Sequence, residues 1–142
     1  MKIEINRSQK KDIKEHLEGC ENSFVFSLSS IVDLDEYADK LHGKSIRIEI
    51  WQAHKLIGLL AFYNKGNKSG YISNVSILPK YYNKGIGQVL LDKCINYLND
   101  LSINKLELEV NKNNIKAFKF YIKNNFIIDK STQTSHYMYR LI

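Results

Sequence analysis

The chain has 142 residues, of which 44% are hydrophobic and 25% are charged, a composition that excludes an intrinsically disordered protein. No apolar run is long enough to span a bilayer. The length allows a buried core, and we expect a single domain that spans residues 1–142. The net charge of +6 favours an anionic ligand or partner, but nucleic acid, acidic lipid and a phosphorylated cofactor would each satisfy it.

The N-terminus, MKIEINRSQKK, is charged but lacks the apolar region of a signal peptide, so we expect a cytoplasmic protein without a membrane partner. The two cysteines, Cys20 and Cys94, are too few and too far apart for a disulfide framework or a zinc site. Both are expected to be reduced and structural, and no metal is expected.

The N-terminal third predicts one strand and two helices. Residues 2–6 alternate between apolar and polar side chains, as a strand does. Ser8 is expected to cap a first helix that ends at Gly19. A capping box that begins at Asp33 predicts a second helix, which is expected to end at Gly43. Residues between the two helices are too irregular to assign.

From residue 45 the pattern changes to alternation, which predicts three strands, at 45–52, 55–63 and 71–78. A tight turn joins the first two strands, and a glycine-rich turn over residues 64–70 joins the second to the third. Apolar residues at helical spacing then predict a helix over about residues 86–98.

A strand at 105–110 follows this helix, and a strand–helix–strand unit of this kind favours parallel pairing with a right-handed crossover. Asn113 or Asn114 is expected to cap another helix, which continues to about Asn124. The two closing strands are expected near 126–128 and 135–141. The sequence therefore predicts a mixed α/β fold, with a central sheet of about seven strands and about four helices in the order β α α β β β α β α β β.

Pro79, Gly85 and Gly87 lie in the segment that leads into the helix at 86–98. A glycine loop at a helix N-terminus leaves several backbone N–H groups without partners and pointing at one spot, where the helix dipole favours an anion. Lys84 can add a full charge there. The pattern predicts a phosphate site, although a plain helix start after a turn would look the same.

Two common phosphate loops are excluded at this position. A Walker loop requires Lys and then Ser or Thr after its last glycine, whereas Gln88 and Val89 follow Gly87. A Rossmann fingerprint requires a third glycine where Leu90 stands.

The segment Tyr82–Gly87 resembles the pyrophosphate loop, Gln/Arg-x-x-Gly-x-Gly/Ala, of the GNAT superfamily of acetyl-CoA-dependent N-acetyltransferases. Residues 108–121 resemble the family's second signature, with LEV at the end of a strand and then NIKAFKFY. Tyr82 stands where the family has Gln or Arg, and Asn125 stands where it usually has glycine. The resemblance covers about residues 55–126.

The resemblance implies a sheet whose fourth and fifth strands splay apart, with acetyl-CoA as co-substrate held between them. Main-chain groups of Val75, Ile77 and Leu78 would bind its pantetheine arm and its acetyl carbonyl. Asn114 and Ala117 would contact the cofactor from the opposite wall. The implied pyrophosphate contacts are Lys84, Gly85, Ile86, Gly87 and Gln88.

In the implied reaction, Tyr121 is expected to act as the catalytic acid for the leaving thiolate, because a neutral tyrosine has a reference pKa of about 10. Glu109 is the candidate base, because relatives that acetylate protein N-termini are proposed to use the glutamate at this place. Two alternatives stay open: Glu109 is a solvated strand residue like Glu107, or the proton leaves through a water.

Contacts to the acceptor are expected from three segments. They are Phe26 and Ser29 in the irregular segment between the first two helices, Asn74 in the strand at 71–78, and His136 and Tyr137 in the closing strand.

Four lysines recur at helical spacing, at Lys112, Lys116, Lys119 and Lys123. We interpret them as a solvated helix face, with Lys112 or Lys116 near the cofactor's phosphate, and expect no nucleic-acid partner.

The sequence therefore predicts an enzyme, an N-acetyltransferase that moves the acetyl group of acetyl-CoA directly to a primary amine without a metal or a covalent enzyme intermediate. A small amine or amino sugar is the expected acceptor, and a protein N-terminus or lysine is the alternative. A CoA-binding module without turnover is the alternative from another class. A homodimer is compatible with the sequence.

Overall fold

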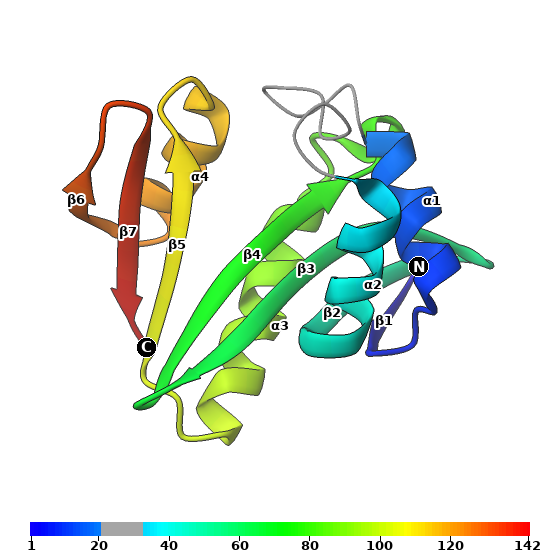
Figure 1. The fold of residues 1–142 in the computed structure, drawn as a ribbon, viewed down its shortest axis with the longest axis horizontal. Helices are drawn as coiled ribbons and strands as arrows, with labels where there is room; N and C mark the ends of the chain where they lie inside the picture. Colours follow the sequence, from blue (N-terminus) through cyan, green and yellow to red (C-terminus); the bar gives the residue numbers. More distant parts are fainter. Residues whose placement is uncertain (21–32) are drawn as a thin grey trace.

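A mixed sheet with the strand order β1-β2-β3-β4-β5-β7-β6 forms the centre of the molecule (Figure 1). This computed structural model describes residues 1–20 and 33–142, so the predictions for Phe26 and Ser29 lie outside the described residues. The strands are β1 (Lys2–Ile5), β2 (Ile46–Gln52), β3 (Lys55–Gly66), β4 (Ser69–Ile77), β5 (Lys105–Asn111), β6 (Ile127–Ser131) and β7 (Ser135–Leu141). The helices are α1 (Lys10–Cys20), α2 (Leu34–Lys44), α3 (Ile86–Asp100) and α4 (Ile115–Lys123), with the short 3-10 helix η3 (Pro79–Tyr81). The predicted mixed α/β fold and its order of strands and α-helices are confirmed.

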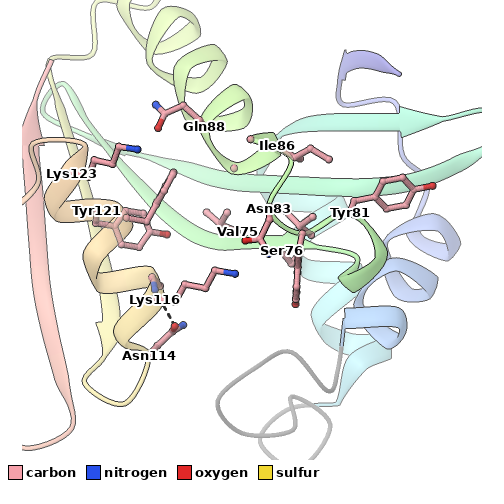
Figure 2. Close-up of a pocket in the computed structure, with 16 residues that line it drawn as sticks. Val75, Ser76, Tyr81, Asn83, Ile86, Gln88, Asn114, Lys116, Tyr121 and Lys123 are labelled. Atoms are coloured by element: carbon pink, nitrogen blue, oxygen red, sulfur yellow. Dashed lines mark hydrogen bonds between the residues drawn. The ribbon is translucent and has the colours of Figure 1, made fainter.

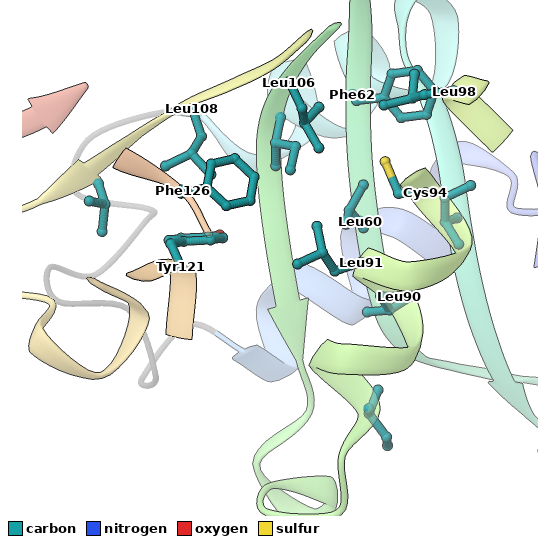
Figure 3. Packing of buried hydrophobic residues seen from close by; sticks show 14 of the residues in the cluster. Leu60, Phe62, Leu90, Leu91, Cys94, Leu98, Leu106, Leu108, Tyr121 and Phe126 are labelled. Carbon is teal, nitrogen blue, oxygen red and sulfur yellow. The ribbon is translucent and has the colours of Figure 1, made fainter. Parts of the chain in front are cut away.

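Two apolar clusters cover the two faces of the sheet. On one face α3 packs against β2, β3 and β4, and Figure 3 shows its buried side chains beside Leu60 and Phe62 of β3. The buried side chains of α3 are Ile86, Leu90, Leu91, Cys94 and Leu98. On the other face α1 and α2 bury a second cluster, which contains Ile13, Leu17 and Leu41. Both cysteines are buried.

The parallel pairing between β4 and β5 stops early. Ser69–Ile72 pairs with Lys105–Leu108, and beyond these residues the two strands separate (Figure 1). A β-bulge lies at the same point, because the register between β3 and β4 shifts between Ala61 and Phe62 and leaves Ser73 as the extra residue. A bulge increases the local twist of a strand, which turns the end of β4 away from β5. The splay that the resemblance implied is therefore present.

Three predicted helix boundaries are wrong. α1 continues past Gly19 to Cys20. The first hydrogen bonds of α1 run to the carbonyl of Gln9 and not to Ser8, since Ser8 uses its N–H and hydroxyl to donate to the Glu49 carboxylate. α2 continues past Gly43 to Lys44, where the next residue supplies the C-cap. The N-terminal cap of α2 at Asp33 is confirmed, because its side chain accepts a hydrogen bond from a first-turn N–H at 3.0 Å.

The hairpin between β3 and β4 is tighter than predicted. Asn67 and Lys68, with φ values of 52° and 60°, make the turn between Gly66 and Ser69. Both strands therefore extend into the segment 64–70, which the glycine pattern had assigned to a turn.

A buried ionic cluster in β2, formed by Arg47 and Glu49, connects the sheet to both N-terminal helices. Glu49 is fully buried, and its carboxylate accepts from the N–H groups of Arg7 and Ser8, the Ser8 hydroxyl, Trp51 Nε1 and Arg47 Nε. The Arg47 guanidinium donates to the carbonyl oxygens of Ser8, Leu41, His42 and Ser45. A buried charge pair is tolerated when its remaining donors and acceptors are satisfied in this way.

We expect Glu49→Gln to destabilise the fold by about 3–5 kcal/mol, because it leaves the buried Arg47 guanidinium without a compensating charge. Urea denaturation measures this loss, as a lower midpoint with an unchanged m value. Glu4→Gln is the control, since Glu4 pairs at 3.8 Å with the exposed Lys2 and such surface pairs contribute at most about 1 kcal/mol. Equal midpoints for the two variants would contradict this account of the cluster.

Candidate active site

The loop between β4 and α3 contains two residues in the left-handed region, Asn83 with φ 61° and Gly85 with φ 77°. Asparagine and glycine accept this conformation at low cost, which explains why they stand there. The first helical hydrogen bond of α3 runs from Val89 N to Gly85 O. Three N–H groups at the start of α3 therefore have no acceptor within the helix. They belong to Ile86, Gly87 and Gln88.

A cavity of about 450 Å³ lies at this helix N-terminus, between β4 and α4 (Figure 2). Nine predicted site residues line it, namely Val75, Ile77, Gly85, Ile86, Gly87, Gln88, Asn114, Ala117 and Tyr121. Six further lining residues were not predicted as contacts, namely Ser76, Tyr81, Tyr82, Asn83, Phe120 and Lys123. Figure 2 shows Tyr121 and Lys116 extending from α4 towards Val75 and Ser76 on β4. The cavity is therefore enclosed by two segments that lie far apart in the sequence.

Two predicted cofactor contacts lie away from this lining. Leu78 is buried in the core, its N–H donates to Ile57 O at 2.9 Å, and its carbonyl accepts from Tyr81 N at 2.8 Å. Its N–H is thus already used within the protein. Lys84 is exposed, and its Nζ lies 5.9 Å from the centre of the Tyr81 ring.

The main chain at the end of β4 has groups that face the splay. The Leu78 N–H points to β3, where it donates to Ile57 O. Successive residues of a strand direct their N–H and C=O groups to opposite neighbours. Ile77 and Val75 therefore direct these groups away from β3, into the gap where β5 no longer pairs with β4. The gap offers hydrogen-bonding groups to an extended ligand.

A second cavity, of about 190 Å³, lies in the gap between β4 and β5. Both cavities are lined by the same four residues, Val75, Asn114, Ala117 and Tyr121. The second cavity also reaches Asn74 and Glu109, which the first does not. The two cavities therefore adjoin each other at this shared wall.

Tyr121 is the aromatic residue at the shared wall. Its ring packs edge-on against Phe126 and Phe120, with ring centres 5.4 Å and 5.5 Å away, so its position is fixed. Burial raises the pKa of Tyr121 to about 12, because the phenolate would lose its hydration. The hydroxyl therefore keeps its proton at neutral pH and can donate a hydrogen bond into the cavities.

Glu109 differs from the neighbouring acid on the same face of β5. Glu107 pairs with Lys65 and with Lys105, the latter at 3.3 Å, which lowers the pKa of its carboxyl. Among the described residues, Glu109 has no ion-pair partner and is exposed at the second cavity. Its negative charge raises the pKa of the nearby Tyr137 hydroxyl. In the described part of the chain, Glu109 thus offers a carboxylate without a cationic partner at the second cavity.

The three described acceptor residues from the sequence analysis separate between the two faces of the sheet. Asn74 lines the second cavity, and Tyr137 pairs in register with Glu109 at its edge. His136 lies opposite Val110, on the face with α4, where its ring packs against Phe118 and its Nδ1 contacts a serine hydroxyl at 2.7 Å.

Positive potential converges on the first cavity. The first turn of α3 and the first turn of α4 both line it, so two helix N-termini face the same space. Asn114 caps α4, as one of the two predicted alternatives, with its side chain accepting from Ala117 N at 3.2 Å. Lys116 and Lys123 also line the cavity, so the lysine stripe is not only a solvated face. These groups favour an anionic ligand.

Comparison with known proteins shows that residues 11–126 match the family model described as the acetyltransferase (GNAT) family. The chain belongs to this family. Acetyltransferase PseH from Campylobacter jejuni is 32% identical over 109 residues, which cover 72% of this chain and 68% of that protein. Streptothricin acetyltransferase A from Bacillus subtilis is 33% identical over 72 residues, which cover 51% and 42%.

Solved structures agree with the GNAT fold. PaiA N-acetyltransferase from Thermoplasma acidophilum, in complex with coenzyme A, superposes with a TM-score of 0.82 at 19% identity over 100% of both chains. The ribosomal-protein alanine N-acetyltransferase from Escherichia coli superposes with a TM-score of 0.78 at 18% identity, over 99% of this chain and 94% of that chain. At these identities the likeness shows the fold alone.

GNAT acetyltransferases take the acetyl group from acetyl-CoA, and the residues of this chain fit that donor. The free N–H groups of α3 and the two lysines suit phosphates, while the free main-chain groups of β4 suit an arm that carries amides. The expected co-substrate is therefore confirmed.

Over residues 1–20 and 33–142, no cluster of three or more His, Cys, Asp and Glu side chains could hold a metal ion. No described helix is long and apolar enough to cross a membrane.

We expect Gly87→Val to lower the affinity for acetyl-CoA by about tenfold or more, because the new side chain would project between two lining residues of the first cavity. A Cβ at Gly87 would lie 3.6 Å from Ile77 Cδ1 and 3.7 Å from Phe120 Cζ, which are ordinary contacts, so the fold should persist. Isothermal titration calorimetry measures the affinity. Gly43→Val is the control, because a Cβ at Gly43 meets nothing within 4 Å. Equal affinities for the two variants would place the cofactor elsewhere.

Proposed function

We propose that this GNAT acetyltransferase moves the acetyl group of acetyl-CoA to the primary amine of a small molecule, by direct transfer. The observation that carries the proposal is the pair of cavities with a common wall at Tyr121. One cavity is lined by cationic groups and helix N-termini, and the other reaches the Glu109 carboxylate, which has no cationic partner among the described residues. An anionic donor and a cationic acceptor would be sorted to opposite sides of the splay.

In this proposal the first cavity holds the donor. The N–H groups of Ile86, Gly87 and Gln88 bind the pyrophosphate, with Lys116 and Lys123 adding charge. Asn114 and Ala117 contact the donor from α4. Main-chain groups of Val75 and Ile77 bind the pantetheine arm and the acetyl carbonyl oxygen, and an N–H aimed at that oxygen would stabilise the charge that develops on it.

The second cavity takes the acceptor. Its volume of about 190 Å³ suits a small polar group better than a folded protein segment. Asn74 and Tyr137 supply hydrogen bonds at its wall and edge, and His136, on the other face, would act only indirectly. A relative with 33% identity over half of this chain is named for the small molecule streptothricin, which supports a small acceptor. Within this class an amino sugar fits a wall of tyrosine and amide groups.

Proton transfer divides between two residues. Glu109, directly or through a water, takes the proton of the alkylammonium so that the amine lone pair becomes available. Tyr121 donates a hydrogen bond to the departing sulfur and is the acid in this position. Because its pKa of about 12 is well above the ~8.5 of a free thiol, stabilisation of the thiolate precedes proton delivery.

Direct transfer is favoured over an acetyl-enzyme because neither described cysteine is a nucleophile. Burial raises the pKa of both the Cys20 and the Cys94 thiol to about 12, so neither forms a thiolate at neutral pH. A CoA-binding module without turnover would have no need for a tyrosine hydroxyl and a free carboxylate at the meeting point of two cavities.

A panel of amines tests the acceptor class, with glucosamine, spermidine and a peptide that begins with alanine as probes and CoA release as the signal. We expect the highest kcat/KM with glucosamine. The highest kcat/KM with the peptide would favour a protein acetyltransferase, and no release with any probe would favour the binding module.

Tyr121→Phe should keep acetyl-CoA affinity and lower kcat roughly 10²-fold, because only the hydroxyl is lost.

Glu109→Gln should lower kcat/KM for the amine at neutral pH by roughly 10²-fold while acetyl-CoA affinity stays the same. The defect should shrink as the pH rises, because the free amine then becomes abundant without a base. Glu107→Gln is the matched control on the same strand, and its activity should remain close to wild type. A wild-type pH profile in Glu109→Gln would mean that the proton leaves through a water held by other groups.

A further inference from the structure

A row of buried polar side chains connects α1 to the end of β4. His16 of α1 is 2% exposed, and its Nδ1 lies 2.8 Å from Leu56 O. Its Nε2 lies 2.9 Å from Ser76 Oγ, which in turn lies 2.8 Å from Asn74 Nδ2. Ser76 and Asn74 are 6% and 7% exposed. The row ends at the second cavity, which Asn74 lines.

The hydrogen bonds in this row run in one direction. A carbonyl oxygen only accepts, so His16 Nδ1 must carry a proton that it donates to Leu56 O. Burial lowers the pKa of His16 to about 4, so the ring is neutral at physiological pH and Nε2 is an acceptor. The Ser76 hydroxyl therefore donates to Nε2. Its oxygen is left to accept a hydrogen bond from the amide nitrogen of Asn74.

The Cys20 thiol, which lies 3.6 Å from His16 Nε2, is consistent with the same direction. Its pKa is raised to about 12, mainly by burial, so the thiol keeps its proton and approaches Nε2 only as a weak donor. The Cys20 thiol therefore does not change the role of His16 Nε2, which remains a hydrogen-bond acceptor.

The row fixes which end of the Asn74 amide faces the cavity. An asparagine amide can turn over, and its two orientations exchange a donor for an acceptor. Here the nitrogen is held by Ser76 Oγ, so Oδ1 is directed away from the row. Among the described residues Oδ1 has no hydrogen-bond partner. Asn74 therefore presents an acceptor, and not a donor, to a ligand in the second cavity.

We propose that His16 and Ser76 are positioning residues, which hold Asn74 Oδ1 in place to accept a hydrogen bond from an N–H of the acceptor amine. The inference rests on the proposed function, since it names a contact of the same acceptor. With one N–H bound by Asn74 and another proton taken through Glu109, a primary amine keeps its lone pair free for the acetyl carbon. The contact therefore orients the nucleophile.

Nitrogen-15 NMR of the histidine side chains tests the direction of the row without any ligand. We expect His16 to be the tautomer protonated at Nδ1, with Nε2 shifted by an accepted hydrogen bond. His16→Gln assigns the signal among the four histidines of the chain. Ser76→Ala should move the Nε2 signal towards that of a free acceptor nitrogen. A ring protonated at Nε2 at neutral pH would overturn the proposal.

Kinetics with the panel amine of highest kcat/KM test the contact. We expect Asn74→Leu and His16→Leu each to raise the KM of the amine roughly fivefold, with the KM of acetyl-CoA unchanged. The double variant should show no more than the Asn74→Leu effect, because His16 acts only through Asn74. His16→Gln should restore most of the wild-type KM, since its amide can donate to Leu56 O and accept from Ser76.

Ser76→Ala should also raise the KM of the amine, whereas Ser45→Ala should not, although each removes one buried hydroxyl. A general loss of stability would affect both serine variants and would appear in their melting temperatures. Additive effects of Asn74→Leu and His16→Leu would overturn the positioning role. If no panel amine is acetylated, the proposed function and the Asn74 contact fail together, while NMR still decides whether the row has the stated direction.

Discussion

Main-chain pairing between β4 and β5 ends at Ile72, and the arrangement of the whole site depends on that interruption. Backbone groups that are removed from both a sheet partner and water cost about 1–3 kcal/mol each, so the free groups of Val75 and Ile77 favour a ligand that can replace the missing strand. The bulge at Ser73 turns β4 just before these residues. α3 and α4 then direct their N-termini at the gap, and both helices are held against each other by Gln88, which donates to Asn124 at 2.8 Å.

The N-terminal half keeps the far side of β4 rigid. The Arg47–Glu49 cluster fixes α1 and α2 on the face of the sheet opposite α3, and His16 projects from α1 onto the end of β4. The orientation of a single amide at the second cavity thus depends on how a helix docks more than fifty residues earlier in the chain. If Asn74 binds the acceptor as proposed, the docking of α1 affects both stability and chemistry, because any shift of α1 would also release Asn74.

The order of elements was predictable because each element has a strong local signal. Alternation marks β2 and β4, apolar spacing marks α3, and the proline and glycines mark the loop between β4 and α3. The bulge at Ser73 has no such signal, since no glycine or proline stands within two residues of it. The row of His16, Ser76 and Asn74 joins residues 60 positions apart, and only the register of β3 with β4 and the docking of α1 bring them together. Ser8 was expected to cap a helix, but the carboxylate of Glu49 is a stronger, charged acceptor for its groups.

Sequence spacing also could not distinguish Glu107 from Glu109, which stand two residues apart and point to the same face of β5. Their neighbours in space distinguish them, because Lys65 and Lys105 neutralise the first and leave the second free. Glu107 lies in the part of β5 that still pairs with β4, whereas Glu109 lies just beyond that pairing and lines the second cavity. The first cavity, with two lysines and two helix N-termini, has the opposite sign. In the proposed function, a chain with a net charge of +6 would therefore attract an anionic donor without repelling a cationic acceptor, because the two would approach the shared wall at Tyr121 through regions of different potential.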